Sequence, residues 1–117
     1  MLAALARLFR KPPPEPQWVE VTALRRQLAE APPPLVVDVR GADEFDGPLG
    51  HIDGARNIPL GELAGYRGEI AAVRRPVVCV CLTDKRSAAA AAQLAAAGVD
   101  QVSVLRGGMK AWREAGP

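Results

Sequence analysis

One cysteine in this chain is followed closely by basic and hydroxyl residues that could hold an anion. Residues 77–81 read Val-Val-Cys-Val-Cys, and Leu-Thr-Asp-Lys-Arg-Ser follows at positions 82–87. Eight of the next ten residues are alanine, the residue with the highest intrinsic helix propensity. The pattern therefore predicts a buried strand over 77–81, a tight loop, and a helix over 87–97 that ends at Gly98.

This arrangement favours the thiolate form of Cys81. A free thiol has a pKa of about 8.5, and only the thiolate is a good nucleophile. The backbone N–H groups of residues 82–87, the positive end of the following helix, and the side chains of Lys85 and Arg86 would all stabilise a negative sulfur. Such a sulfur could accept a sulfur atom from an anionic donor as a persulfide and pass it to cyanide or a thiol. This chemistry needs no metal and no organic cofactor.

The rest of the chain alternates between strand and helix patterns. We expect strands over 18–21, 35–39, 55–58 and 102–105, and helices over 22–31, 60–73 and 109–114. Thr22 is the predicted N-cap of the first helix, and the glycines within 60–73 predict two short helices there. Residues 40–50 read as a loop with a helical turn around 43–45. The alternation favours an α/β sandwich with a mainly parallel sheet, in which ligands lie beyond the carboxyl ends of the strands.

Residues 1–17 are predicted to be an N-terminal segment and Pro-rich linker, and residues 18–117 the folded domain. Apolar residues of segment 1–11 fall on one helical face, as in a membrane-surface anchor, but about three turns bury little apolar area. We favour a short helix that frays or packs loosely. Four prolines within 12–16 then predict a stiff, extended linker.

Composition excludes several functional classes. The net charge of +2 argues against a nucleic-acid partner, and no apolar stretch is long enough to span a bilayer. Cys79 and Cys81 lie two positions apart on one strand, about 7 Å, which exceeds the usual reach of a disulfide. Free cysteines fit a reducing, cytoplasmic compartment. Two cysteines and one histidine disfavour a structural zinc site.

Four segments between residues 18 and 112 resemble the single-domain rhodanese-like sulfurtransferases. They are Val-Asp-Val-Arg at 37–40 with Glu44, Gly-His-Ile-Asp-Gly-Ala-Arg-Asn-Ile-Pro at 50–59, the stretch 81–87, and Gly-Gly-Met-Lys-Ala-Trp at 107–112. The resemblance implies a three-layer sandwich, with a five-stranded parallel sheet and helices on both faces. It also implies that Cys81 carries the sulfur and that the amides of 82–86 and the Arg86 side chain bind the oxyanion end of the donor. The predicted catalytic residues are Cys81 and Arg86, and the predicted donor-binding residues are Leu82, Thr83, Asp84, Lys85, Arg86, Ser87 and Arg40.

The length of the loop separates sulfur from phosphate chemistry. From Cys81 to Arg86 there are six residues, as in the family's sulfurtransferases, whereas related phosphatases and arsenate reductases have one more. We expect a loop that fits a persulfide to be too tight for phosphate, because the packed backbone of the loop does not widen readily. Many members carry glycine where this chain has Asp84, and we expect its carboxylate to point outwards, towards Lys85 or Arg86. The alternative function is a module that relays sulfur to, or recognises, one protein partner, and a third, less favoured function is arsenate or phosphate chemistry.

Two residues invite a catalytic role that we do not favour. Cys79 could be a resolving thiol, but a small buried strand residue is the simpler interpretation. His51 is the only histidine and suggests a Cys–His dyad. A thiolate stabilised by amides needs no such base, so we expect His51 to fix its glycine-rich loop through hydrogen bonds.

Two charged residues near the second strand also have two interpretations each. Asp38 could act as an acid or base, but we expect it to accept amide hydrogen bonds from the following loop, because a buried carboxylate needs partners. Arg40 follows a strand at the expected ligand edge and could line the path of the donor. We favour an ion pair of Arg40 with Asp43 or Glu44.

Overall fold

Five short strands, three of them rich in valine, form the sheet of this computed structural model, which describes residues 15–117. The strands are β1 (Gln17–Val19), β2 (Leu35–Asp38), β3 (Arg56–Asn57), β4 (Val77–Val80) and β5 (Val102–Leu105). Their order is β1-β5-β4-β2-β3, and neighbouring strands all pair in parallel. The predicted five-stranded parallel sheet is confirmed. The helix expected over 1–11 and most of the proline-rich linker lie outside the described residues.

Helices follow the strands as the sequence pattern indicates. They are α2 (Val21–Leu28), α3 (Ala42–Phe45), the 3-10 helix η1 (Leu60–Tyr66), α4 (Arg67–Val73), α5 (Lys85–Ala96) and α6 (Gly108–Glu114). The expected pair of short helices over 60–73 is confirmed, and the turn around 43–45 is α3. The predicted N-cap at Thr22 is wrong, because α2 already begins at Val21 after Glu20, which makes no side-chain cap.

The start of α5 differs from the sequence prediction in a way that matters for the site. The helix begins at Lys85 rather than at position 87, so Arg86 and Ser87 belong to its first turn. At the other end, Gly98 has the positive φ of +99° expected of a residue just past a helix. The loop between β4 and α5 is therefore shorter than predicted, with only residues 81–84 outside regular structure.

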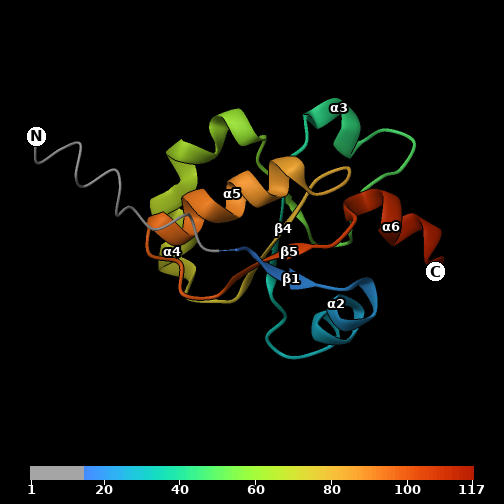
Figure 1. Cartoon of the computed structure of the whole chain (residues 1–117), viewed down its shortest axis with the longest axis horizontal. Helices are drawn as coiled ribbons and strands as arrows, with labels where there is room; N and C mark the ends of the chain where they lie inside the picture. Colours follow the sequence, from blue (N-terminus) through green and yellow to red (C-terminus); the bar gives the residue numbers. More distant parts are fainter. Residues whose placement is uncertain (1–14) are drawn as a thin grey trace, which may run out of the picture.

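Helices cover both faces of the sheet (Figure 1), and alternate side chains of β4 belong to two separate core clusters. Val78 and Val80 pack on one face with Leu24 of α2 and Met109 of α6. Val77, Cys79 and Cys81 belong to the cluster on the opposite face, with η1, α4 and α5. The alanines of α5 bring that helix close to the sheet, because they add little side-chain volume. Among the described residues, no helix combines the length and apolarity that a membrane crossing requires.

Candidate active site

Cys81 directly follows the central strand of the sheet, at its carboxyl edge. The loop that begins there is flanked by two others at the same edge, one after β2 and one after β5. The first leads from Asp38 into α3, and the second contains Gly107, directly before Gly108 begins α6. Since carboxyl ends of parallel strands are where ligands bind in such sheets, the position of Cys81 agrees with a site for chemistry.

The sulfur of Cys81 is buried, although the loop that follows it is exposed to solvent. Cys81 is 1% exposed, whereas Leu82 and Thr83 beside it are exposed. The backbone N–H of Ser87 donates to Sγ at 3.3 Å, and Ser87 Oγ lies 3.2 Å from the same sulfur. We expected several loop amides at the sulfur, but within the described part of the chain only that of Ser87 is at hydrogen-bond distance.

The other peptide groups of the loop are oriented by α6. Met109 N–H donates to the carbonyl of Cys81 at 2.8 Å, and Lys110 N–H donates to that of Leu82 at 3.1 Å. A Cβ at Gly108 would overlap the carbonyl oxygens of Cys81, Leu82 and Thr83. In a planar trans peptide the N–H points opposite to the C=O, so the N–H groups of residues 82–84 point away from α6. That is the side of the sheet on which the sulfur lies.

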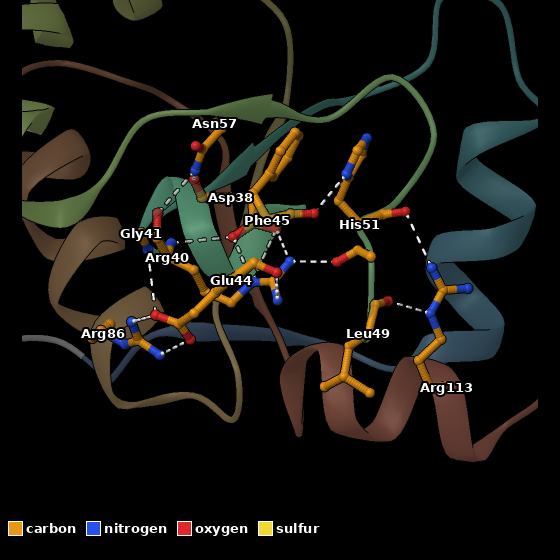
Figure 2. Close-up of polar contacts among 11 residues, drawn as sticks. Asp38, Arg40, Gly41, Glu44, Phe45, Leu49, His51, Asn57, Arg86 and Arg113 are labelled. Atoms are coloured by element: carbon orange, nitrogen blue, oxygen red, sulfur yellow. Dashed lines mark hydrogen bonds and ion pairs between the residues drawn. The ribbon is translucent and has the colours of Figure 1, made fainter. Parts of the chain in front are cut away.

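Arg86, in the first turn of α5, forms an ion pair with Glu44 of α3 (Figure 2). Its Nη1 and Nη2 lie 2.7 and 3.0 Å from the two carboxylate oxygens, and the side chains are 38% and 40% exposed. The hydrogen bond from Arg86 keeps the pKa of Glu44 below its ordinary value, and Glu44 in turn raises the pKa of Arg86. Nothing in the local sequence relates these two residues, which are 42 positions apart.

Asp84 departs from its predicted contacts. Arg86 is taken by Glu44, and among the described residues Asp84 has no ion pair with Lys85 or with any other cation. Its φ of −151° is not left-handed, so the loop does not require glycine at this position. Asp84 is half-buried, and the structure gives no reason for a carboxylate there.

Arg40 is buried and points into the segment 41–50, so the predicted ion pair with Asp43 or Glu44 is wrong. Its guanidinium pairs with Asp38 at 2.7 Å and donates to the carbonyls of Glu44 and Gly50 at 3.0 and 2.7 Å. Asp38 does accept an amide, the Arg40 N–H at 3.1 Å, but its main partner is the guanidinium. A buried carboxylate takes the nearest full positive charge because burial is otherwise costly for it.

The same network contains His51. Its Nδ1–H donates to the carbonyl of Phe45 at 2.9 Å, and the two rings stack with centroids 3.6 Å apart. Arg113 donates to the carbonyls of Leu49 and His51. Figure 2 shows His51 well apart from Arg86. The expectation that His51 fixes its loop agrees with these contacts.

Cys79 lies below Cys81 on the same face of β4, as expected. It is fully buried, and burial raises the pKa of its thiol to about 12. Both cysteines are free. Within residues 15–117, no cluster of histidine, cysteine, aspartate or glutamate side chains is arranged to hold a metal ion.

A groove of about 490 Å³ lies elsewhere, on the α2 and α6 face. Its lining includes Arg25, Arg75 and Arg113 together with Trp112. Each arginine already donates to a backbone carbonyl, so these side chains join loops and helix ends. Cys81 does not line this groove.

Comparison with known proteins identifies the family. Residues 20–115 match the rhodanese-like domain family. Over 89 residues the chain is 42% identical to "Thiosulfate sulfurtransferase GlpE" of Shewanella oneidensis, an alignment that covers 76% of this chain and 85% of that protein. It is 43% identical over 77 residues to YqhL of Bacillus subtilis, named an uncharacterized protein, with 66% of this chain and 59% of that protein covered.

A solved structure agrees with the sequence relatives. SSP1007 of Staphylococcus saprophyticus superposes with a TM-score of 0.74 at 27% identity, over 86% of this chain and 96% of that one. The match to the family spans nearly all of the described chain and includes β2 to β5 and the Cys81 loop. The chain therefore belongs to the rhodanese-like domain family.

Proposed function

We propose that this chain is a thiosulfate sulfurtransferase in which Cys81 carries the transferred sulfur. One observation supports this most directly. The thiol lies at the end of the central strand, the Ser87 N–H donates to its sulfur, and N–H groups of α6 bind the carbonyls of the loop. A negative sulfur is stabilised by such an arrangement. The relative from Shewanella oneidensis, named a thiosulfate sulfurtransferase, supports the choice of donor.

The proposed first step conserves atoms and charge. The Cys81 thiolate attacks the terminal sulfur of thiosulfate and forms a new S–S bond. The S–S bond of thiosulfate breaks, and its electron pair leaves with sulfite. In the second step cyanide or a thiolate attacks the outer sulfur of the persulfide, the Cys81–sulfur bond to it breaks, and the thiolate of Cys81 is regenerated.

The burial of Cys81 defines how the donor must approach. Only the terminal sulfur atom has to reach Sγ, while the sulfonate end stays at the rim formed by residues 82–86. There the N–H groups turned away from α6 and the charges of Lys85 and Arg86 would hold the donor's oxygens. Arg40, being 1% exposed, supports the segment 41–50 in this proposal and does not contact the donor.

Intact mass after incubation with thiosulfate tests the proposal. We expect a gain of one sulfur atom, which cyanide removes and which Cys81→Ser lacks. Cys79→Ser is the matched control and should keep the adduct, because it removes the other thiol of the same strand. Absence of an adduct with thiosulfate, mercaptopyruvate and glutathione persulfide alike would contradict the proposal.

A relay of sulfur to a protein acceptor is the second candidate. Leu82, next to Cys81, is exposed and would offer a protein partner an apolar side chain beside the sulfur. In that case the adduct would form, but its removal by cyanide would be slow compared with its removal by a protein thiol. Both functions need reduced Cys81, which favours a reducing compartment such as the cytoplasm.

A further inference from the structure

We infer that Glu44 determines donor specificity at the proposed site, by occupying Arg86 and weakening the attraction of the site for dianionic donors. This inference rests on the proposed function and concerns a residue of α3, outside the loop that holds the thiol. Glu44 is a positioning and charge-setting residue rather than one that touches the reacting atoms.

The contacts of Glu44 fix its carboxylate on both sides. Both terminal nitrogens of the Arg86 guanidinium are engaged, at 2.7 and 3.0 Å. The Gly41 N–H reaches Glu44 Oε1 at 3.4 Å from the other side. The Glu44 carbonyl accepts from buried Arg40 at 3.0 Å, which holds the helix and hence the carboxylate in place (Figure 2).

The position of the pair places this carboxylate near the proposed path of the donor. Arg86 immediately precedes Ser87, whose N–H and Oγ contact the Cys81 sulfur. Both side chains of the pair are more than a third exposed, so an anion in solution can reach them. A sulfonate that reaches Arg86 must therefore approach Glu44 as well.

Pairing with Glu44 leaves some hydrogen-bond donors of Arg86 free for a donor anion, but it cancels the positive charge that would attract that anion. An arginine has five N–H donors, and end-on pairing with a carboxylate leaves its Nε–H and outer Nη–H groups available. Arg86 can thus still donate to an oxyanion while bound to Glu44. The net charge of the pair is zero, however, so a dianion is repelled by one partner about as much as the other attracts it. Donors with a single negative charge lose less of their electrostatic attraction to Arg86.

Glu44→Gln tests this, with Asp43→Asn as the matched control. Glutamine keeps the size of the side chain and an oxygen for Arg86 but removes the charge. Asp43 is on the same helix, is exposed, and has no ion pair among residues 15–117. Its substitution removes the same charge without touching Arg86.

We expect Glu44→Gln to lower the KM for thiosulfate about fivefold, the scale of a partly exposed charge interaction, with kcat within about twofold. Asp43→Asn should leave both within about twofold of wild type. This decrease in KM should become smaller as ionic strength rises, because salt screens the partly exposed charges of the pair. A KM that rises in Glu44→Gln would mean that Glu44 mainly orients Arg86, and equal changes in both variants would mean a general charge effect. Either result overturns the inference.

A second readout does not depend on sulfur transfer. The rates at which Cys81 is alkylated by iodoacetate, an anion, and by iodoacetamide, which is neutral, can be followed by intact mass, with Cys81→Ser as the blank. Glu44→Gln should raise the ratio of the iodoacetate rate to the iodoacetamide rate, because less negative charge then faces the approaching anion; Asp43→Asn should leave this ratio within about twofold of wild type. If wild type transfers no sulfur but the ratio rises in Glu44→Gln, the proposed function fails while the charge effect of Glu44 stands. If wild type transfers sulfur and neither KM nor the ratio responds to Glu44→Gln, the inference alone fails.

Discussion

The buried pair of Arg40 and Asp38 gives a prediction whose size follows from the structure. Both side chains are 1% exposed, and their closest N–O distance is 2.7 Å. Arg40→Met keeps most of the side-chain volume but leaves the Asp38 carboxylate buried without its partner. Breaking a buried pair in this way costs about 3–5 kcal/mol. We therefore expect the free energy of unfolding to fall by that amount in urea denaturation.

A surface pair provides the matched control. Arg56 contacts Glu69 at 2.8 Å, but the two side chains are 37% and 56% exposed. Such pairs contribute about 0–1 kcal/mol, so Arg56→Met should lose no more than that. Adding Asp38→Leu to Arg40→Met should recover part of the loss, because no unpaired charge then remains buried.

Two results would refute this reasoning. The first is that Arg40→Met destabilises the protein no more than Arg56→Met. The second is that Arg40→Met keeps the stability of wild type and raises the KM for thiosulfate, which would mean that Arg40 contacts the donor as its sequence position suggested. If Arg40→Met does not fold, Arg40→Lys retains the charge and should give a smaller loss in the same assay.

Four further substitutions, one of them with a control, test other parts of the molecule. Gly108→Ala should lower the free energy of unfolding by about 2–4 kcal/mol, because φ is +57° and a Cβ would overlap the loop carbonyls; Gly61→Ala, whose Cβ would meet no atom within 4 Å, should be neutral or stabilising by up to about 1 kcal/mol. His51→Ala should cost about 1–2 kcal/mol of stability through its lost hydrogen bond and ring contact, and a loss of rate without a change in melting temperature would contradict that role. Cys79→Ala should react with thiosulfate at the wild-type rate, as followed by mass, because a thiol with a pKa of about 12 is not ionised near neutral pH. Asp84→Gly should increase the rate with thiosulfate, since it removes a carboxylate from the loop; an unchanged or lower rate would show that Asp84 does not restrict the donor.

Local patterns were enough to predict most of the fold. The apolar run before Cys81 and the alanines after it define β4 and α5, because strand burial and helix propensity are properties of neighbouring residues. Element ends were less predictable. The helix α5 begins two residues earlier than expected, since Lys85 and Arg86 are themselves good helix formers and the loop needs only four residues.

The position of Cys81 and the structural interpretations of Cys79 and His51 could likewise be reached from sequence. The partners of the arginines could not. Arg40 has several acidic residues within a few positions, and the sequence alone favoured the wrong ones. Arg40 pairs with Asp38 because the Asp38 carboxylate is buried as part of β2 and needs a positive charge beside it.

The sequence by itself determined the order of the elements and the cysteine that follows the strand over 77–81, since each depends on residues close together in the chain, and the alternation of strands and helices indicated a parallel sheet. Only the tertiary structure decided that Glu44 contacts Arg86 across 42 positions, and that Gly108 lies against the loop carbonyls. Both contacts join loops after different strands. They exist because parallel pairing brings the carboxyl ends of β2, β4 and β5 to one edge, and no pattern within a single segment encodes which side chains meet there.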